Sequence, residues 1–316
     1  MCEEIGNLEK CKTGKIIGSA GVQKLKEQHP KMRLIPARWV CARKTETKVR
    51  SRIVAKDLAH GSARKAGFSS PTPSHDAFML TLIMMAVHNL AGCGLDVSHA
   101  FMHSPLTSKV PIVLKMPLSV SLPDGSPAYF LLYAALNGLR DASQAWLYLL
   151  SELIKPLHLL SDEREPCLFT GWLEPEGDCP GGRAIVLCYV DDVLVISDSA
   201  SVERRIIAAI QSRVPVKITG RIHQDINGGG SITFIGRIIR RWPGTSTVEV
   251  FVRTDYLVPC WEAYQIKKGS SAFPNIAVLL EEHANSKPLS PEAYSSFFRA
   301  WMINDLVFVS SLTLLT

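Results

Sequence analysis

The chain has 316 residues, of which 47% are hydrophobic and 20% are charged, and its formal net charge is +6. This composition excludes an unfolded chain, and the length is sufficient for a core of one or two subdomains. The eight cysteines contain no CxxC pair, which argues against a zinc knuckle or a disulfide framework and indicates free intracellular thiols. The N-terminus lacks the order of a signal peptide, and the apolar C-terminal stretch is too short to span a bilayer, so we expect no membrane segment.

The first third of the chain carries most of the positive charge. Residues 1 to about 30 show weak periodicity and many lysines, which predicts a poorly packed lead-in. From Lys31 to Lys65 eleven basic residues stand against two acidic ones. Alternation in 39–42 and 50–55 predicts an antiparallel hairpin with its turn at 44–48. This basic hairpin suits a polyphosphate partner, although a solvated basic face explains the charge equally well.

The middle of the chain predicts a helix, a strand and a second helix. Ser74 is a favourable N-cap for a helix from Asp76 to Leu90, which is apolar nearly all round and therefore expected to be buried. A short strand, 93–97, follows and places Asp96 near its end. The next helix is expected from about Ala142 to Lys155, because Pro156 ends it.

Two adjacent aspartates, Asp191 and Asp192, interrupt an otherwise apolar run over 184–197. The flanks predict two short strands, which place both carboxylates at the tight connection of a hairpin. Two like charges so close repel each other, and a divalent cation with oxygen ligands is the usual compensation. A solvated turn is the alternative for the dipeptide alone.

The remaining elements complete a β-α-β-β-α-β order. A helix from about Val202 to Arg213, capped by Ser201, precedes a strand at Ile232 to Ile238. This order predicts an α+β fold with a ferredoxin-like sheet, in which Asp96 approaches Asp191 at one edge. Beyond Gly244 the patterns are weaker, and they predict a strand at 247–253, helices at 254–266 and 291–302, and a linker at 267–273.

Several blocks of the chain resemble the reverse transcriptases of copia-type (Pseudoviridae) LTR retrotransposons. The blocks are Tyr189-Val190-Asp191-Asp192, Gly94 to His103, Leu136 to Trp146, Arg50 to Lys56, Phe68 to Pro71, and Phe234-Ile235-Gly236. Their order and spacing agree with the family over roughly residues 36–265. The resemblance implies a right-hand polymerase with fingers, a ferredoxin-like palm and an incomplete thumb. Residues 1–30 would be the poorly defined lead-in, 31–265 the fingers and palm, and 266–316 a linker and thumb remnant.

The resemblance also implies an activity and a metal site. The activity is that of an RNA-directed DNA polymerase, which transfers a nucleotide from a dNTP to a primer 3′-hydroxyl. Two Mg²⁺ ions, which Mn²⁺ can replace, would assist this transfer. Asp96 and Asp191 would be bridging ligands, the Val97 carbonyl a backbone ligand, and Asp192 an outer ligand.

The remaining site residues would contact the nucleotide or the template. The nucleotide-binding residues would grip the triphosphate or line the nucleotide pocket: Arg52, Ala100, Phe101, Asn137 and Gly138. The nucleic-acid-binding residues would contact the template or the primer: Arg50, Lys56, Arg140 and Tyr189. Phe101 aligns with the aromatic that lies under the incoming sugar in the family, and Arg140 could reach a phosphate.

Two rival functions remain open. Asn137, Arg140-Asp141, Ser143 and Ser104 depart from the family pattern, which favours a catalytically silent remnant that only binds nucleic acid. A ferredoxin-like RNA-binding module would need stacking aromatics, and the strand before the paired aspartates offers only Tyr189. The expected partners are an RNA or DNA template with its primer and dNTPs. We expect a polyprotein fragment without its ribonuclease H and integrase parts, located in cytoplasmic virus-like particles or in the nucleus.

Overall fold

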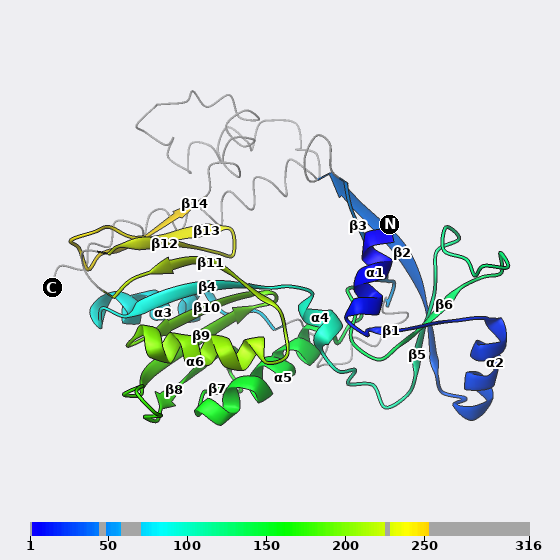
Figure 1. The fold of residues 1–316 in the computed structure, drawn as a ribbon, viewed down its shortest axis with the longest axis horizontal. Coiled ribbons are helices and arrows are strands. Elements are labelled where there is room, and N and C mark those ends of the chain that lie inside the picture. Colours follow the sequence, from blue (N-terminus) through cyan, green and yellow to red (C-terminus); the bar gives the residue numbers. More distant parts are fainter. Residues whose placement is uncertain (1, 44–48, 58–70, 225–227, 253–316) are drawn as a thin grey trace, which may run out of the picture.

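The chain forms two β-sheets that lie side by side, each with its own helices (Figure 1). The computed structural model describes residues 2–43, 49–57, 71–224 and 228–252. Its elements are mixed α+β, as the sequence predicts. The predicted helices at 254–266 and 291–302, the linker at 267–273, the thumb remnant and the Phe68 to Ser70 part of one block lie outside the described residues.

The smaller sheet has five strands in the order β1-β6-β5-β2-β3. Their bounds are β1 Gly14–Ile17, β2 Arg33–Arg43, β3 Val49–Ala55, β5 Ile112–Lys115 and β6 Tyr129–Leu132. β2 and β3 pair antiparallel from Ala37↔Ala55 to Arg43↔Val49, which confirms the predicted basic hairpin. This hairpin projects beyond the rest of the sheet (Figure 1).

The predicted poorly packed lead-in is folded. The first residues form helix α1 (Cys2–Lys10), strand β1 and helix α2 (Ser19–Gln28). The lead-in packs against the small sheet through α1 and β1, whereas no residue of α2 is buried. β1 is hydrogen-bonded to β6, and Leu8 of α1 is only 1% exposed in the core of the small sheet. Ile5 and Leu8 are three residues apart and so lie on one helix face, a short repeat that the lysines around it obscure.

The larger sheet has nine strands in the order β14-β13-β12-β11-β4-β10-β9-β8-β7. Its bounds are β4 Ala91–Val97, β7 Leu160–Asp162, β8 Glu165–Leu173, β9 Gly182–Tyr189, β10 Asp192–Ser197, β11 Val216–Ile222, β12 Gly230–Phe234, β13 Arg237–Arg241 and β14 Val248–Val252. β4 lies between β11 and β10, with β9 beyond β10. Along the chain β4, helix α5 (Ala142–Ile154), β9, β10, helix α6 (Ala200–Gln211) and β11 occur in the predicted β-α-β-β-α-β order. Other elements are inserted into this order, including β5 and β6 before α5 and β7 and β8 after it.

The last strand of that unit is not the one the sequence predicts. The expected strand at Ile232 to Ile238 is broken by a turn, because Ile235 and Gly236 have positive φ values of 49° and 68°. The strand beside β4 is β11 instead, and its register shifts between Ile218 and Gly220. That irregularity and its glycine interrupt the alternation by which a strand is recognised.

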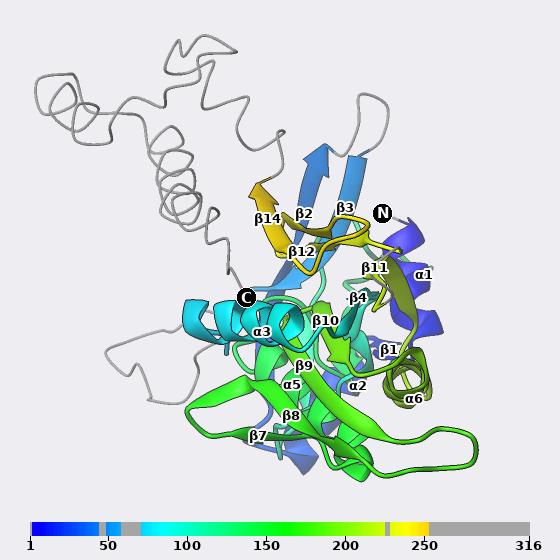
Figure 2. The same cartoon turned by 90° about the vertical axis from the view of Figure 1, so that its left-hand side faces the viewer.

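Helices cover both faces of the larger sheet (Figure 2). α3 (His75–Val87) packs on one face, whereas α5 (Ala142–Ile154) and α6 (Ala200–Gln211) pack on the other. The 3₁₀ turn Lys155–Leu157 follows α5 and contains Pro156, as expected. The N-cap of α6 is Ser199, whose side chain accepts from the Val202 N–H, and the prediction of Ser201 is wrong.

α3 is less buried than its apolar composition predicts. Ser74 caps it as expected, accepting a hydrogen bond of 3.0 Å from the Ala77 N–H. Leu80, Ile83 and Val87 are 52%, 39% and 56% exposed, so only one side of the helix faces the sheet. In the described part of the chain, no helix is long and apolar enough to cross a membrane.

Candidate active site

The Asp191-Asp192 pair lies at a two-residue hairpin turn. Tyr189 of β9 pairs with Asp192 of β10, which leaves Val190 and Asp191 as the turn residues. Val190 has a φ of 53°, a left-handed conformation that is uncommon for a β-branched side chain. Such a conformation is maintained only when surrounding contacts determine it.

Two hydrogen bonds hold this turn in place. The indole N–H of Trp146, a side chain of α5 that is 1% exposed, donates to the Val190 carbonyl. The Val97 N–H at the end of β4 donates to the Asp191 carbonyl at 2.8 Å. The turn is therefore tied to α5 on one side and to β4 on the other.

Replacing Trp146 with Phe is expected to lower the free energy of unfolding by about 1–3 kcal/mol, because the Val190 carbonyl loses its indole donor and keeps only the weak Cys188 thiol at 3.5 Å. Urea unfolding measures this decrease. Trp172→Phe is the matched control, because Trp172 is 54% exposed. Equal stability of the two variants would contradict the proposed restraint of the turn.

The three predicted aspartates come together although Asp96 is distant from the others in sequence. Asp192 lies directly opposite Asp96 across β10 and β4, so both side chains leave the same face. Burial raises the pKa of Asp192 to about 6, with repulsion from Asp191 and Asp96 adding to the shift and a backbone hydrogen bond from Ile235 opposing it. The carboxylates are thus close enough to repel one another.

This donor set fits a hard divalent cation, which prefers carboxylate and carbonyl oxygens. Among the described residues, no three acidic, histidine or cysteine side chains are already arranged to ligate one ion. The structure therefore places the donors at one edge of the sheet without a closed metal site.

A cavity of about 210 Å³ lies between the hairpin turn, the short helix α4 (Ala100–His103) and the basic hairpin. Eight of the predicted site residues line it: Arg50, Arg52, Asp96, Val97, Ala100, Phe101, Asn137 and Asp191. Basic side chains from the smaller sheet and carboxylates from the larger one thus face a single cavity. This arrangement suits an anionic ligand that is held together with a cation.

The other predicted residues do not line this cavity. Asp192 is half-buried behind the turn, Tyr189 packs against the core beneath α3, and Lys56 is exposed beyond the end of β3. Gly138 has a φ of 86°, and a Cβ there would lie 2.1 Å from the Ala55 carbonyl oxygen. Only glycine fits this close approach.

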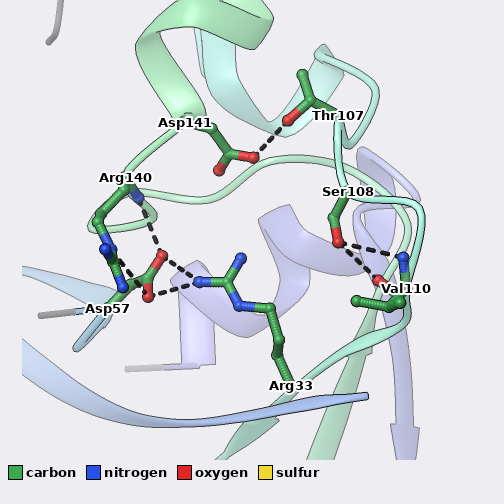
Figure 3. A network of polar contacts seen from close by, with 7 residues as sticks. All are labelled: Arg33, Asp57, Thr107, Ser108, Val110, Arg140 and Asp141. Carbon is green, nitrogen blue, oxygen red and sulfur yellow. Dashed lines mark hydrogen bonds and ion pairs between the residues drawn. The ribbon is translucent and has the colours of Figure 1, made fainter. Parts of the chain in front are cut away.

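Arg140 contacts a carboxylate and not the cavity (Figure 3). Its Nε lies 3.5 Å from Asp57 Oδ1, and its backbone N–H donates to Asp57 Oδ2 at 3.2 Å. The guanidinium of Arg140 is thus engaged with Asp57, and its contact with a phosphate stays a prediction.

Sequence reasoning missed two residues of this region. Glu4 of α1 lines the cavity, is 7% exposed, and its Oε1 has no hydrogen-bond partner among the described residues. Lys217 of β11 lies directly opposite Asp96. Glu4 was missed because its segment was assigned to the lead-in, and Lys217 because its strand was not recognised. The apolar spacing of α1 is the signal that could have revealed the first.

Comparisons with known proteins identify the family of this chain. A family model described as "Reverse transcriptase (RNA-dependent DNA polymerase)" matches residues 22–226, which is more than half of the chain. The chain therefore belongs to the reverse transcriptase (RNA-dependent DNA polymerase) family.

Curated relatives confirm the resemblance to copia-type retrotransposons. The Ty1-GR3 and Ty1-OR Gag-Pol polyproteins of Saccharomyces cerevisiae are each 25% identical over 195 residues, or 61% of this chain. The match covers 10% of each polyprotein, so the chain spans only about a tenth of these relatives. Among solved structures, apo telomerase from Candida tropicalis, truncated from its C-terminal domain, is similar at a TM-score of 0.41 and 10% identity, over 78% of this chain and 59% of that one.

Proposed function

We propose that this chain is an RNA-directed DNA polymerase domain that transfers a nucleotide from a dNTP to the 3′-hydroxyl of a primer. The observation that carries the proposal is the single cavity lined by two arginines and two aspartates. Such a cavity offers cationic groups to a triphosphate beside carboxylates that could hold its metal. In this proposal the smaller sheet acts as fingers and the larger one as palm.

The proposed metal ligands are the Asp96 and Asp191 carboxylates and the Val97 carbonyl, with Asp192 as an outer ligand. Two Mg²⁺ ions, or Mn²⁺ in their place, supply charge neutralisation at the attacking and leaving oxygens when bound there. The Asp192 carboxylate does not line the cavity, and the backbone of Ile235 favours its charged form, which partly offsets the rise of its pKa by burial.

The other cavity residues are proposed to bind and orient the nucleotide. Arg52, half-buried on β3, lines the cavity and would contact the triphosphate in a bidentate manner, because a planar guanidinium matches two phosphate oxygens. Arg50, exposed two residues away on the same strand face, would contact phosphate of the nucleotide or template. Ala100, Phe101 and Asn137 form the wall that would meet the sugar and base.

The proposed partner is an RNA or DNA template paired to a primer. Contacts through the phosphate backbone carry no sequence information and depend strongly on salt. Replacing Arg50, Arg52 and Lys56 together with Ala is expected to reduce the slope of log K against log salt by about 0.9 for each phosphate that the protein no longer neutralises. Fluorescence anisotropy of a labelled primer–template duplex over a salt series measures that slope.

The control for the Arg50, Arg52 and Lys56 triple variant removes the same number of charges from a different surface. Lys15, Lys24 and Lys26 are exposed on β1 and α2, and their replacement with Ala should leave the slope close to that of the parent. Equal slopes for both triple variants would show that the hairpin does not bind the template.

The alternative function is nucleic-acid binding without catalysis. The engagement of Arg140 with Asp57 favours it, since this arginine stands in a block that departs from the family pattern. Primer extension on poly(rA)·oligo(dT) with Mg²⁺ or Mn²⁺ decides between the two. Binding without extension in either metal would support the alternative and reject the polymerase.

A further inference from the structure

A buried carboxylate at the foot of the basic hairpin is bound by two arginines. Asp57 follows β3 by two residues and is 9% exposed. The Arg33 Nη2 donates to both of its oxygens at 2.6 Å, and the backbone N–H of Arg140 donates at 3.2 Å (Figure 3). Burial alone would raise the pKa of Asp57, but Arg33 and Arg140 together hold it below its usual range. The carboxylate is therefore ionised at neutral pH.

The turn that contains Arg140 is joined to β3 at a second point. The Ala55 N–H donates to the Asn137 carbonyl at 2.8 Å, and Gly138 leaves no room for a side chain against the Ala55 carbonyl. Asp141, at the end of the same turn, accepts a hydrogen bond from the Thr107 hydroxyl on the loop after α4 (Figure 3). The turn is thus restrained from two directions.

These contacts connect the two sides of the cavity. Arg52 lies on β3, three residues before Ala55, and Asn137 lies on the restrained turn. Both side chains line the cavity. The separation between Arg52 and Asn137 therefore depends on how the foot of β3 is held against the turn.

We infer that Asp57 is a positioning residue for the incoming nucleotide, which fixes the basic hairpin against the Asn137 turn by binding Arg33 and Arg140. The inference rests on the proposed polymerase function and adds a residue that does not touch the nucleotide. Removing the charge of Asp57 weakens its contacts with Arg33 on the hairpin and with Arg140 on the turn, and the hairpin can then shift relative to the turn. A shift of that kind weakens ground-state binding of the triphosphate more than it slows the chemical step.

Steady-state extension on a primer–template separates these effects. Asp57→Asn is expected to raise the KM for dNTP by about tenfold with kcat within about twofold of the parent, and Asp57→Glu, which keeps the charge, should restore most of the affinity. Asp162→Asn is the matched control, because Asp162 forms an exposed ion pair with Arg164 at 2.8 Å. The control should retain the parent KM.

Direct binding of a fluorescent deoxynucleoside triphosphate supplies a readout that needs no turnover. Weaker binding by Asp57→Asn supports the inference even in a chain that does not extend primers. If the parent extends primers and Asp57→Asn keeps its KM while its melting temperature falls, Asp57 is only structural and the inference is overturned. A parent that neither extends primers nor binds the triphosphate overturns the proposed function together with the inference.

Should Asp57→Asn fail to fold, Arg33→Lys carries the test. Lysine keeps the positive charge of Arg33 but lacks the planar guanidinium that contacts both Asp57 oxygens. An intermediate rise in KM is expected for this variant. A folded Arg33→Lys protein with parent KM and parent triphosphate binding would overturn the inference.

Discussion

Asp191→Asn is expected to reduce primer extension by at least about a hundredfold while binding of primer–template stays close to that of the parent. The rate should fall because Asp191 is a proposed metal ligand at the cavity, and removing one group that stabilises transition-state charge costs on the order of 10²–10³ in rate. Binding should persist because the proposed template contacts lie on the basic hairpin. Single-nucleotide extension and fluorescence anisotropy measure the two quantities on the same preparation.

The control for Asp191→Asn is Asp178→Asn, which removes the same charge from the exposed loop between β8 and β9. It should extend primers at the parent rate. Extension by Asp191→Asn at more than a few per cent of the parent rate would reject the metal assignment. A failure of both extension and binding would indicate a misfolded variant, which circular dichroism can identify.

Phe101→Val is expected to raise the relative incorporation of ribonucleotides by well over tenfold. Phe101 lines the cavity from α4, half-buried, five residues after Asp96. A ring beneath the incoming sugar would leave no room for a 2′-hydroxyl, and a discrimination of about 1.4 kcal/mol already corresponds to a factor of ten. Competition between dNTP and rNTP in single-nucleotide extension measures the ratio.

Phe101 also packs against the cores of both sheets, so its replacement tests stability as well as selectivity. Phe251→Val supplies the comparison, because Phe251 is 38% exposed on β14 and does not line the cavity. This control should reject ribonucleotides as the parent does. A folded Phe101→Val protein with unchanged selectivity would show that Phe101 is a core aromatic and not the sugar gate.

Local patterns in the chain were sufficient for the elements nearest the site. Apolar runs on either side of Asp191 and Asp192 predicted β9 and β10, and alternation predicted the basic hairpin. Ser74 and Pro156 marked a helix start and a helix end where the structure has them. Each of these signals lies within a few residues of the feature it determines, so no tertiary information was needed to interpret it.

Element order alone predicted that Asp96 approaches Asp191, whereas the direct pairing of Asp96 with Asp192 was seen only in the structure. A β-α-β-β-α-β unit places its first strand beside its third, and β4 does lie beside β10. The fourth strand was misassigned because a register shift and Gly220 break the alternation of β11. Consequently, the position of Lys217 opposite Asp96 could not be predicted.

Residue patterns alone were enough to predict that the acidic pair lies at a hairpin turn, that the basic segment forms a second hairpin, and to which family the chain belongs. The three-dimensional arrangement was needed to show that Glu4 lines the cavity and that Asp57 is bound by Arg33 and Arg140. Both arrangements depend on packing between segments distant in sequence, and a charged side chain carries no local signal of its future partner. A buried charge is costly unless it is paired, so burial favours such contacts. This burial occurs only when the two sheets and α1 assemble.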